Sequence, residues 1–298
     1  MDIKKPLTFE DQVKRLVTHK MDVSNVDFAK RILAEVNYYR FSGYALQYRD
    51  KNNPDDYVIG TRFEDVWRLY QFDNELRCIL KVHLDSVEIY MRSQIAYEFS
   101  MTKCSGPPYN QHYDNTHFYN KASHSEIITS SLDREKENNK DALFVIHHSD
   151  KYEGKMPLWV IVELLSFTNL LKLYSAMYHS GQDAIAQNVG VTGQVLKNHL
   201  HCMANLRNKV AHAGRLYNAL YNPPVKLGSS YLQRNPKIKS NTFFAYIIVL
   251  MRKLPNKTAK ALLATTIIDT MVQYEDCIHL SLLGFPVEYV RLLCDEIR

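Results

Sequence analysis

Glycine and proline are scarce in this sequence, with ten of each among 298 residues. A turn-rich β fold needs more of both, so the composition favours helices. The five cysteines are an odd number without a CxxC pair, which indicates free thiols in a reducing cytoplasm. The longest apolar run, 243–251, is about half of a membrane span, and residues 1–12 lack the apolar segment of a signal peptide. We therefore expect a cytoplasmic protein that has no membrane partner.

Carboxylates are missing from one long tract. Residues 184–268 contain no Asp or Glu but twelve Lys and Arg. The whole chain has a net charge of +5, so the remainder, with 25 basic against 32 acidic residues, carries −7. Either acidic surfaces elsewhere in the fold neutralise the tract, or it forms a face that binds a polyanion, most simply nucleic acid.

Helical periodicity runs through most of the chain, without an internal repeat. The expected helices cover 8–20, 25–36, 61–100, 124–139, 156–178, 192–213, 241–254, 256–275 and a short segment after 286. Between them we expect a turn or short strand-like segment over 37–49, a loop over 101–123 and a linker over 221–240. The fold class is therefore all-α. A helical bundle over 61–298 follows an N-terminal helical extension over 1–60, the two forming one compact domain.

The predicted helix over 192–213 places an arginine on its apolar side. On a helical wheel Arg207 lies within the apolar face, whereas Asn208 and His212 lie four residues apart on the polar side. A buried guanidinium stays charged and needs a carboxylate or an anionic ligand. Glu163, the one carboxylate in the apolar run 158–167, is the first candidate partner, and Glu88 is the second.

Two interpretations of this helix remain open. In the structural one, an Arg207–Glu163 ion pair orients two packed helices. In the functional one, Arg207 binds phosphate and His212 moves protons near neutral pH. The two residues are about 7.5 Å apart along a straight helix and point in different directions. They can act together only if the helix ends or bends near His212, which Gly214 makes plausible, or if a second copy faces them.

The motif "RNKVAH" (207–212) is similar to the R-x4-H pattern of the HEPN superfamily. Around it, in order, stand "VNYYRFSGY" (36–44), "LYQFDNELR" (69–77), "VEIYMRSQIA" (87–96), "PLWVIVELLSF" (157–167), "LRNKVAHAGRLYN" (206–218) and "LGFP" (283–286). With these landmarks the chain resembles, over nearly its whole length, the Abi-like family of bacterial abortive-infection proteins of the AbiD and AbiF type.

The resemblance implies an HEPN-like helical bundle with additional N- and C-terminal helices, in a phage-defence protein. Active HEPN proteins are typically metal-independent endoribonucleases that work as dimers, in which the 2′-hydroxyl of RNA attacks the adjacent phosphodiester. Carried over to this chain, Arg207 holds the phosphate, His212 is the general acid and base, and Asn208 orients the histidine or the phosphate. No cofactor is implied.

We accordingly expect a homodimeric, toxic ribonuclease that is kept silent either by a low-activity resting state or by an inhibitory protein or RNA partner. The alternative is a non-catalytic RNA-binding or sensor module that uses the same basic face. In either case Glu163 has an orienting role, and the residues expected to bind RNA are Lys197, Lys209, Arg215, Lys237 and Lys239.

The segment 103–124 gives weaker evidence of a functional site. Its Cys104, His112, Asp114, His117 and His124 have spacings that fit no standard zinc pattern, so we expect no metal site. Its aromatic residues either pack on the surface or stack on single-stranded bases; they are Tyr109, Tyr113, Phe118 and Tyr119.

Overall fold

The computed structural model describes residues 5–109, 113 and 115–298. All regular secondary structure in these residues is helical, with fifteen α-helices, short 3-10 segments and only isolated β-bridges. The predicted all-α class is confirmed. Within the same residues, no helix is both long enough and apolar enough to cross a membrane.

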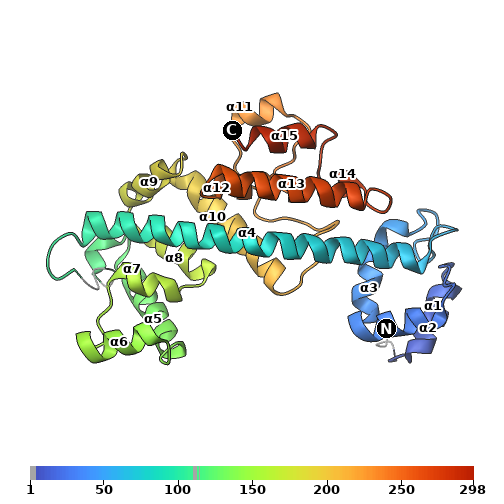
Figure 1. Ribbon diagram of the computed structural model, residues 1–298, viewed down its shortest axis with the longest axis horizontal. Helices are drawn as coiled ribbons and strands as arrows, with labels where there is room; N and C mark the ends of the chain where they lie inside the picture. Colours follow the sequence, from blue (N-terminus) through green and yellow to red (C-terminus); the bar gives the residue numbers. More distant parts are fainter. Residues whose placement is uncertain (1–4, 110–112, 114) are drawn as a thin grey trace.

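One long helix forms the spine of the molecule (Figure 1). Helix α4 (Phe63–Lys103) has 41 residues and begins with two acidic residues, Glu64 and Asp65, which suit the positive end of the helix dipole. One face of α4 is almost completely buried along its length. Because a helix rises about 1.5 Å per residue, α4 spans about 60 Å and brings distant parts of the chain together.

An N-terminal lobe lies at one end of the spine (Figure 1). It consists of α1 (Phe9–Thr18), α2 (Val26–Val36), α3 (Tyr38–Tyr44) and the 3-10 segment η1 (Ala45–Tyr48). The turn or strand-like segment expected over 37–49 is wrong, because the chain is helical over 38–48. Asn37, with φ 67°, ends α2, and its side chain accepts a hydrogen bond from the backbone N–H of Tyr39, which starts α3 at once.

A second lobe lies at the other end of α4 (Figure 1). It contains α5 (Ala122–Asn138), α6 (Leu143–Tyr152), α7 (Leu158–Ile161), η4 (Val162–Leu164) and α8 (Phe167–Ala176). The single helix expected over 156–178 is wrong, since Leu165 is extended (ψ 130°) and Ser166 caps a new helix by accepting from the N–H of Asn169. The expected loop over 101–123 contains a short 3-10 segment, η3 (Thr116–Phe118).

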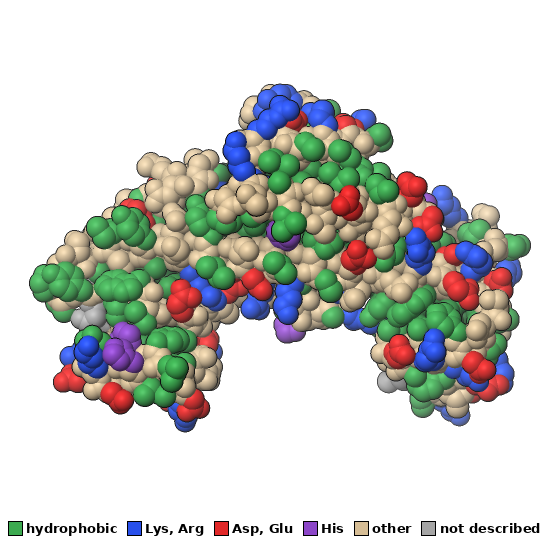
Figure 2. Space-filling view, viewed as in Figure 1, with side chains coloured by type: hydrophobic (Ala, Val, Ile, Leu, Met, Phe, Trp, Pro, Cys, Tyr) green, Lys and Arg blue, Asp and Glu red, His purple; other side chains and the backbone are tan. Residues whose placement is uncertain are grey.

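The remaining helices form the middle part of the molecule (Figure 1). They are α9 (His179–Asn188), α10 (Gly193–Ala211), α11 (Ser229–Arg234), α12 (Phe243–Lys253), α13 (Lys257–Gln273), α14 (Leu280–Leu283) and α15 (Tyr289–Asp295). Of these, α9, α10, α12 and α13 contact α4, and α15 packs on α13. Helix α12 contacts α4, α10 and α13, and its residues 243–251 are all buried. The space-filling view shows an arch, with the two lobes on either side of a hollow and Lys, Arg and His side chains on its underside (Figure 2).

A buried carboxylate on α4 joins three segments of the chain. Asp73 is fully buried and accepts hydrogen bonds from Tyr44 Oη of α3 at 2.7 Å, from Arg77 and from the backbone N–H groups of Leu216 (2.9 Å) and Tyr217 (2.7 Å). Burial raises the pKa of the Asp73 carboxyl, and the Arg77 charge and these hydrogen bonds counteract that rise. Asp73 therefore fixes the chain just after α10 to both α3 and α4.

Replacing Asp73 with Asn tests this junction. We expect Asp73→Asn to lower the free energy of unfolding by about 3 to 5 kcal/mol, because it leaves the buried Arg77 guanidinium without its carboxylate. Urea unfolding followed by circular dichroism measures the change. Asp85→Asn, at an exposed position of α4, is the matched control and should cost less than about 0.5 kcal/mol. Equal losses in the two variants would contradict this role for Asp73.

Candidate functional site

Helix α10 ends immediately before the histidine of the motif. Its buried face includes Leu196, Leu200, Met203 and Leu206, and His212 is its C-terminal cap residue. The backbone then turns sharply, with Ala213 at φ 50° and the N–H of Gly214 donating to the carbonyl of Lys209 at 2.7 Å. A Cβ atom at position 214 would lie only 3.0 Å from that carbonyl oxygen, so the turn requires glycine.

The arginine of the motif contacts a buried carboxylate on α4. Arg207 Nε lies 3.4 Å from Oε2 of Glu88, which is itself held by Arg92 at 2.6 Å. The expected Arg207–Glu163 pair is therefore corrected to an Arg207–Glu88 contact. Because the chain breaks at Leu165, Glu163 lies in a short 3-10 segment, is 55% exposed and reaches Arg92 at 3.7 Å instead.

Arg207 keeps part of its donor capacity free. Its side chain is 37% exposed, and in the part of the chain that the structure describes its terminal nitrogens make no hydrogen bond. By contrast, Arg92 is only 16% exposed and also donates to the carbonyl of Leu165 at 2.6 Å. Glu88 thus has a firm partner in Arg92 and a looser one in Arg207, which leaves the Arg207 guanidinium able to bind an anion.

The other two residues of the motif lie at the same end of α10. Asn208 is half-buried, and its side-chain amide is 3.4 Å from the Thr168 hydroxyl of α8. His212 is exposed. From the N-terminal lobe, Arg40 donates to the carbonyl of Ala213, the residue after His212. The structure therefore brings the sequence-predicted Arg, Asn and His together at one helix end, although no hydrogen bond in the described residues joins Arg207 to His212.

Comparison with known proteins identifies the family. The sequence model of a family described as Abi-like protein matches residues 31–218, more than half of the chain. The chain belongs to the Abi-like family. The matched range contains α4 with Asp73 and Glu88 and the whole of α10, and it ends one residue after Tyr217. No curated protein and no solved structure matches the chain.

The RNA-binding residues predicted in this Abi-like protein do not form one group. Lys209 lies with its ammonium over the Tyr221 ring (5.2 Å), and burial lowers its pKa. Lys197 is exposed but lies ten residues before Arg207, about 15 Å along α10. Lys237 pairs with Glu288 at 3.8 Å. Their role in RNA binding stays a prediction.

Two further members of that predicted set differ in their surroundings. Lys239 is exposed in the segment that leads into α12. Arg215 donates to the carbonyl of Gly43 and lies beside the Tyr44 ring (6.0 Å to the centroid), so it links the chain after α10 to the N-terminal lobe. Of the predicted cations, Arg215 is thus the one that joins the end of α10 to another lobe.

Only some of the histidines on α10 are available for proton transfer. His199 is buried, with Nε2 2.9 Å from the carbonyl oxygen of Lys226. Burial lowers the pKa of His199 to about 4, and the nearby Lys253 and Arg252 charges act in the same direction. His199 is therefore neutral at physiological pH, whereas His201 and His212 are exposed to solvent.

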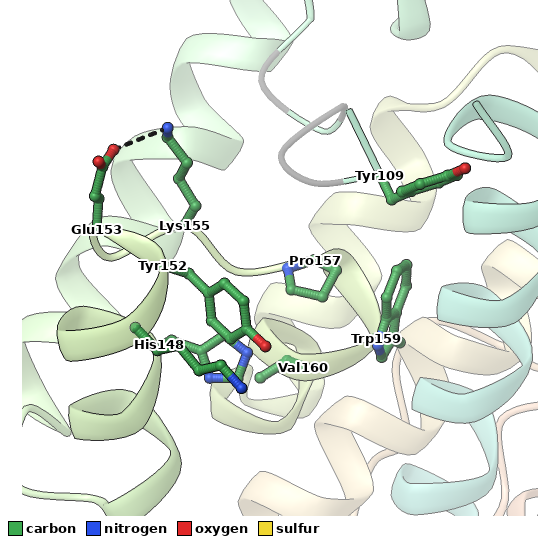
Figure 3. A pocket seen from close by; sticks show the side chains of 9 residues that line it. Tyr109, His148, Tyr152, Glu153, Lys155, Pro157, Trp159 and Val160 are labelled. Atoms are coloured by element: carbon green, nitrogen blue, oxygen red, sulfur yellow. Dashed lines mark hydrogen bonds and ion pairs between the residues drawn. The ribbon is translucent and has the colours of Figure 1, made fainter. Parts of the chain in front are cut away.

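A separate hollow of about 610 Å³ lies between α6 and α7. Figure 3 shows Tyr109 and Trp159 on one side of it and His148 and Tyr152 on the other, with the Glu153–Lys155 ion pair (3.1 Å) at its rim. The hollow is lined mainly by aromatic and aliphatic side chains, and none of the motif residues lines it.

The segment 103–124 contributes to this hollow mainly through Tyr109, which is 55% exposed. Tyr113 and Tyr119 are buried, so stacking of these two on bases is wrong. His112 and Asp114 lie outside the described residues.

Asp73 and Arg77 are not among the residues predicted from the sequence. The pattern that indicates them is nevertheless visible, because Asp73 lies on the same apolar face of the helix as Leu69, Leu76 and Leu80 and has an arginine four residues later. A carboxylate on an apolar helix face with a basic residue one turn away predicts a buried ion pair.

Substitution of the two arginines around Glu88 separates structural from functional roles. We expect Arg92→Met to lower the free energy of unfolding by about 3 kcal/mol, because Glu88 is buried and loses its closest partner. Arg207→Met should cost less than about 1 kcal/mol, since Glu88 keeps Arg92. Urea unfolding of both variants measures this. A loss for Arg207→Met as large as that for Arg92→Met would make Arg207 a structural residue.

The low pKa of His199 predicts a pH dependence of stability. Between about pH 6.5 and pH 4 the unfolded chain binds a proton at His199 that the folded chain does not, so stability falls as the pH falls. The loss at pH 4 should reach about 3 kcal/mol, since one pKa unit equals about 1.4 kcal/mol. As the pH is lowered from 7.5 to 4, the urea midpoint of unfolding should fall less steeply in His199→Gln than in wild type. His201→Gln, at an exposed position, should keep the wild-type slope, and an unchanged slope in His199→Gln would refute this assignment.

Proposed function

We propose that this Abi-like protein is a phage-defence effector that cleaves RNA without a metal ion, through Arg207, Asn208 and His212. The observation that carries the proposal is the end of α10, where an exposed histidine follows an arginine whose terminal nitrogens make no hydrogen bond within the described residues. The defence role follows from membership of the Abi-like family. The ribonuclease activity follows from the R-x4-H motif and the chemistry of these side chains.

The proposed reaction is an attack of the RNA 2′-hydroxyl on its own phosphodiester. A histidine removes the 2′-hydroxyl proton, the oxygen bonds to phosphorus, and the bond from phosphorus to the 5′-oxygen breaks. A protonated histidine gives the leaving oxygen its proton, and the product is a 2′,3′-cyclic phosphate. The Arg207 guanidinium stabilises the negative charge that develops on the phosphate oxygens. Glu88 positions Arg207, and Asn208 binds the phosphate or orients the histidine.

This reaction favours a homodimer. It needs one base and one acid, and each chain supplies a single motif histidine, His212. Arg207 and His212 are also about 7.5 Å apart along the helix axis, which is far for one phosphate. A two-fold pairing of the α10 ends places two arginines and two histidines in one groove. We propose that a protein or RNA partner covers this groove in uninfected cells.

Histidine substitution tests the proposal directly. Wild type, His212→Ala and the control His201→Ala, at another exposed position of α10, are incubated with single-stranded and structured RNAs in EDTA. We expect wild type and His201→Ala to leave 2′,3′-cyclic phosphate ends, and His212→Ala to lose at least about 100-fold in rate, since acid–base catalysis contributes that much. RNA affinity, measured by filter binding, should stay within about twofold of wild type, because His212 moves protons and Arg207 holds the phosphate.

The other outcomes of this experiment are also informative. Equal cleavage by all three proteins would exclude His212 as the catalytic residue. Binding without cleavage by any of them would support the alternative, a non-catalytic RNA-binding or sensor module. Light scattering on the same samples reports the mass in solution, and a monomer that cleaves RNA would remove the composite site.

A further inference from the structure

Two adjoining hollows in the N-terminal lobe are lined by an excess of cations. They have volumes of about 700 and 370 Å³, and Tyr39 and Ser42 line both. We call them together the basic cleft. Of the described residues, one carboxylate, Asp55, lines the cleft, against six basic side chains: Lys5, Arg15, His19, Arg40, Arg49 and Arg215.

Among the residues that the structure describes, the arginines of the basic cleft have no carboxylate partner. Arg40, Arg49 and Arg215 donate to the carbonyl oxygens of Ala213, Asp55 and Gly43. Arg15, too, is absent from the salt bridges of the described residues. A carbonyl dipole orients a guanidinium but does not neutralise its charge, so these arginines retain the capacity to bind an anion.

The N-terminal lobe also carries cations that do not line the cleft. Lys14, Lys20 and Lys30, which do not line the cleft, are each paired with a carboxylate at 2.8 to 3.4 Å. Within the cleft, His19 shares Asp56 with Lys20, at 3.4 Å. The lysines outside the cleft are therefore paired, whereas the arginines that line it have no carboxylate partner among the described residues; Arg31, which packs on the Phe28 ring outside the cleft, is likewise without one.

The basic cleft leads to the motif. Arg40 donates to the carbonyl of Ala213, the residue next to His212, and Arg215 lies three residues after His212 and lines the smaller hollow. Tyr39, where the two hollows meet, is 87% exposed. An exposed aromatic ring beside unpaired arginines matches how proteins hold single-stranded nucleic acid, with phosphates on the cations and a base on the ring.

We propose that the basic cleft binds a single-stranded RNA and leads it to His212. Arginines bind the phosphates of the strand, and Tyr39 stacks on an unpaired base. This inference rests on the proposed ribonuclease function and adds where the substrate strand is held. It places the strand on the N-terminal lobe, whereas the sequence predicted binding by the tract 184–268. A duplex does not offer Tyr39 an unstacked base, so the expected ligand is single-stranded.

Binding of a labelled oligonucleotide tests the proposal. The probe is a fluorescein-labelled uridine 12-mer, measured by anisotropy from 50 to 300 mM salt on the full-length His212→Ala protein, which does not consume it. We expect Arg15→Gln combined with Tyr39→Ala to weaken binding at least about tenfold and to reduce the salt slope by about one. Lys14→Gln, which removes a neighbouring exposed charge outside the cleft, should bind within about twofold of the parent.

The same experiment separates this inference from the proposed function. If wild type cleaves the 12-mer, but the cleft substitutions change neither binding in the His212→Ala protein nor cleavage in the wild-type background, the ribonuclease stands and the cleft proposal fails. If nothing is cleaved but binding depends on the cleft, the cleft proposal stands and the ribonuclease fails. Equal competition by duplex RNA or polyglutamate would show a general anion site and overturn the assignment to single-stranded RNA.

A second measurement does not depend on the folding of a variant. The 12-mer carrying 4-thiouridine is cross-linked to wild-type protein, and the modified peptides are mapped by mass spectrometry. We expect adducts within 38–44, the segment that contains Tyr39. Adducts confined to 184–268 would overturn the proposal.

Discussion

Two carboxylates buried on one face of α4 determine where the motif lies. Asp73 binds the backbone N–H groups of Leu216 and Tyr217, and Glu88 contacts Arg207. They are fifteen residues apart, or about 22 Å along the helix. The end of α10 and the turn that follows it are held between these two points. The position of His212 is therefore set by α4, which is the longest helix of the described residues and the one with the most buried residues.

Both buried carboxylates are stabilised in the same way. Each is paired with an arginine one turn later on α4, Arg77 for Asp73 and Arg92 for Glu88. Buried charges cost free energy unless they are paired and hydrogen-bonded, so these arginines make the two carboxylates tolerable within α4 itself. The segment after α10 then supplies additional donors. Within α10 itself, Arg207 is a second partner of Glu88, and its guanidinium is left half-exposed for another ligand.

The sequence predicts the helix, the motif and the fold class, because these depend on local periodicity. It names the observed partner of Arg207, Glu88, only as the second candidate after Glu163. Glu163 stands in an apolar run and looked buried, but the break at Leu165 turns it toward solvent. That break depends on the cap formed by Ser166, a contact that competes with an otherwise good helical pattern. The basic cleft is less predictable still, since it joins α1 to Arg215, two hundred residues later.

The missing carboxylates of 184–268 now have a physical explanation in two parts. Three of the twelve cations of the tract contact carboxylates outside it: Arg252 pairs with Glu296 at 2.5 Å, Lys237 contacts Glu288 at 3.8 Å, and Arg207 contacts Glu88, which it shares with Arg92. Acidic residues within the tract would compete for these cations with Glu88, Glu288 and Glu296, whose long-range pairs connect the tract to α4 and to the C-terminal helices. Arg215 differs, because its contacts are a carbonyl and a tyrosine ring. Nine of the twelve cations of the tract have no salt bridge among the described residues, and one of these nine, Arg215, lies three residues after the motif histidine, where an anionic strand would have to pass.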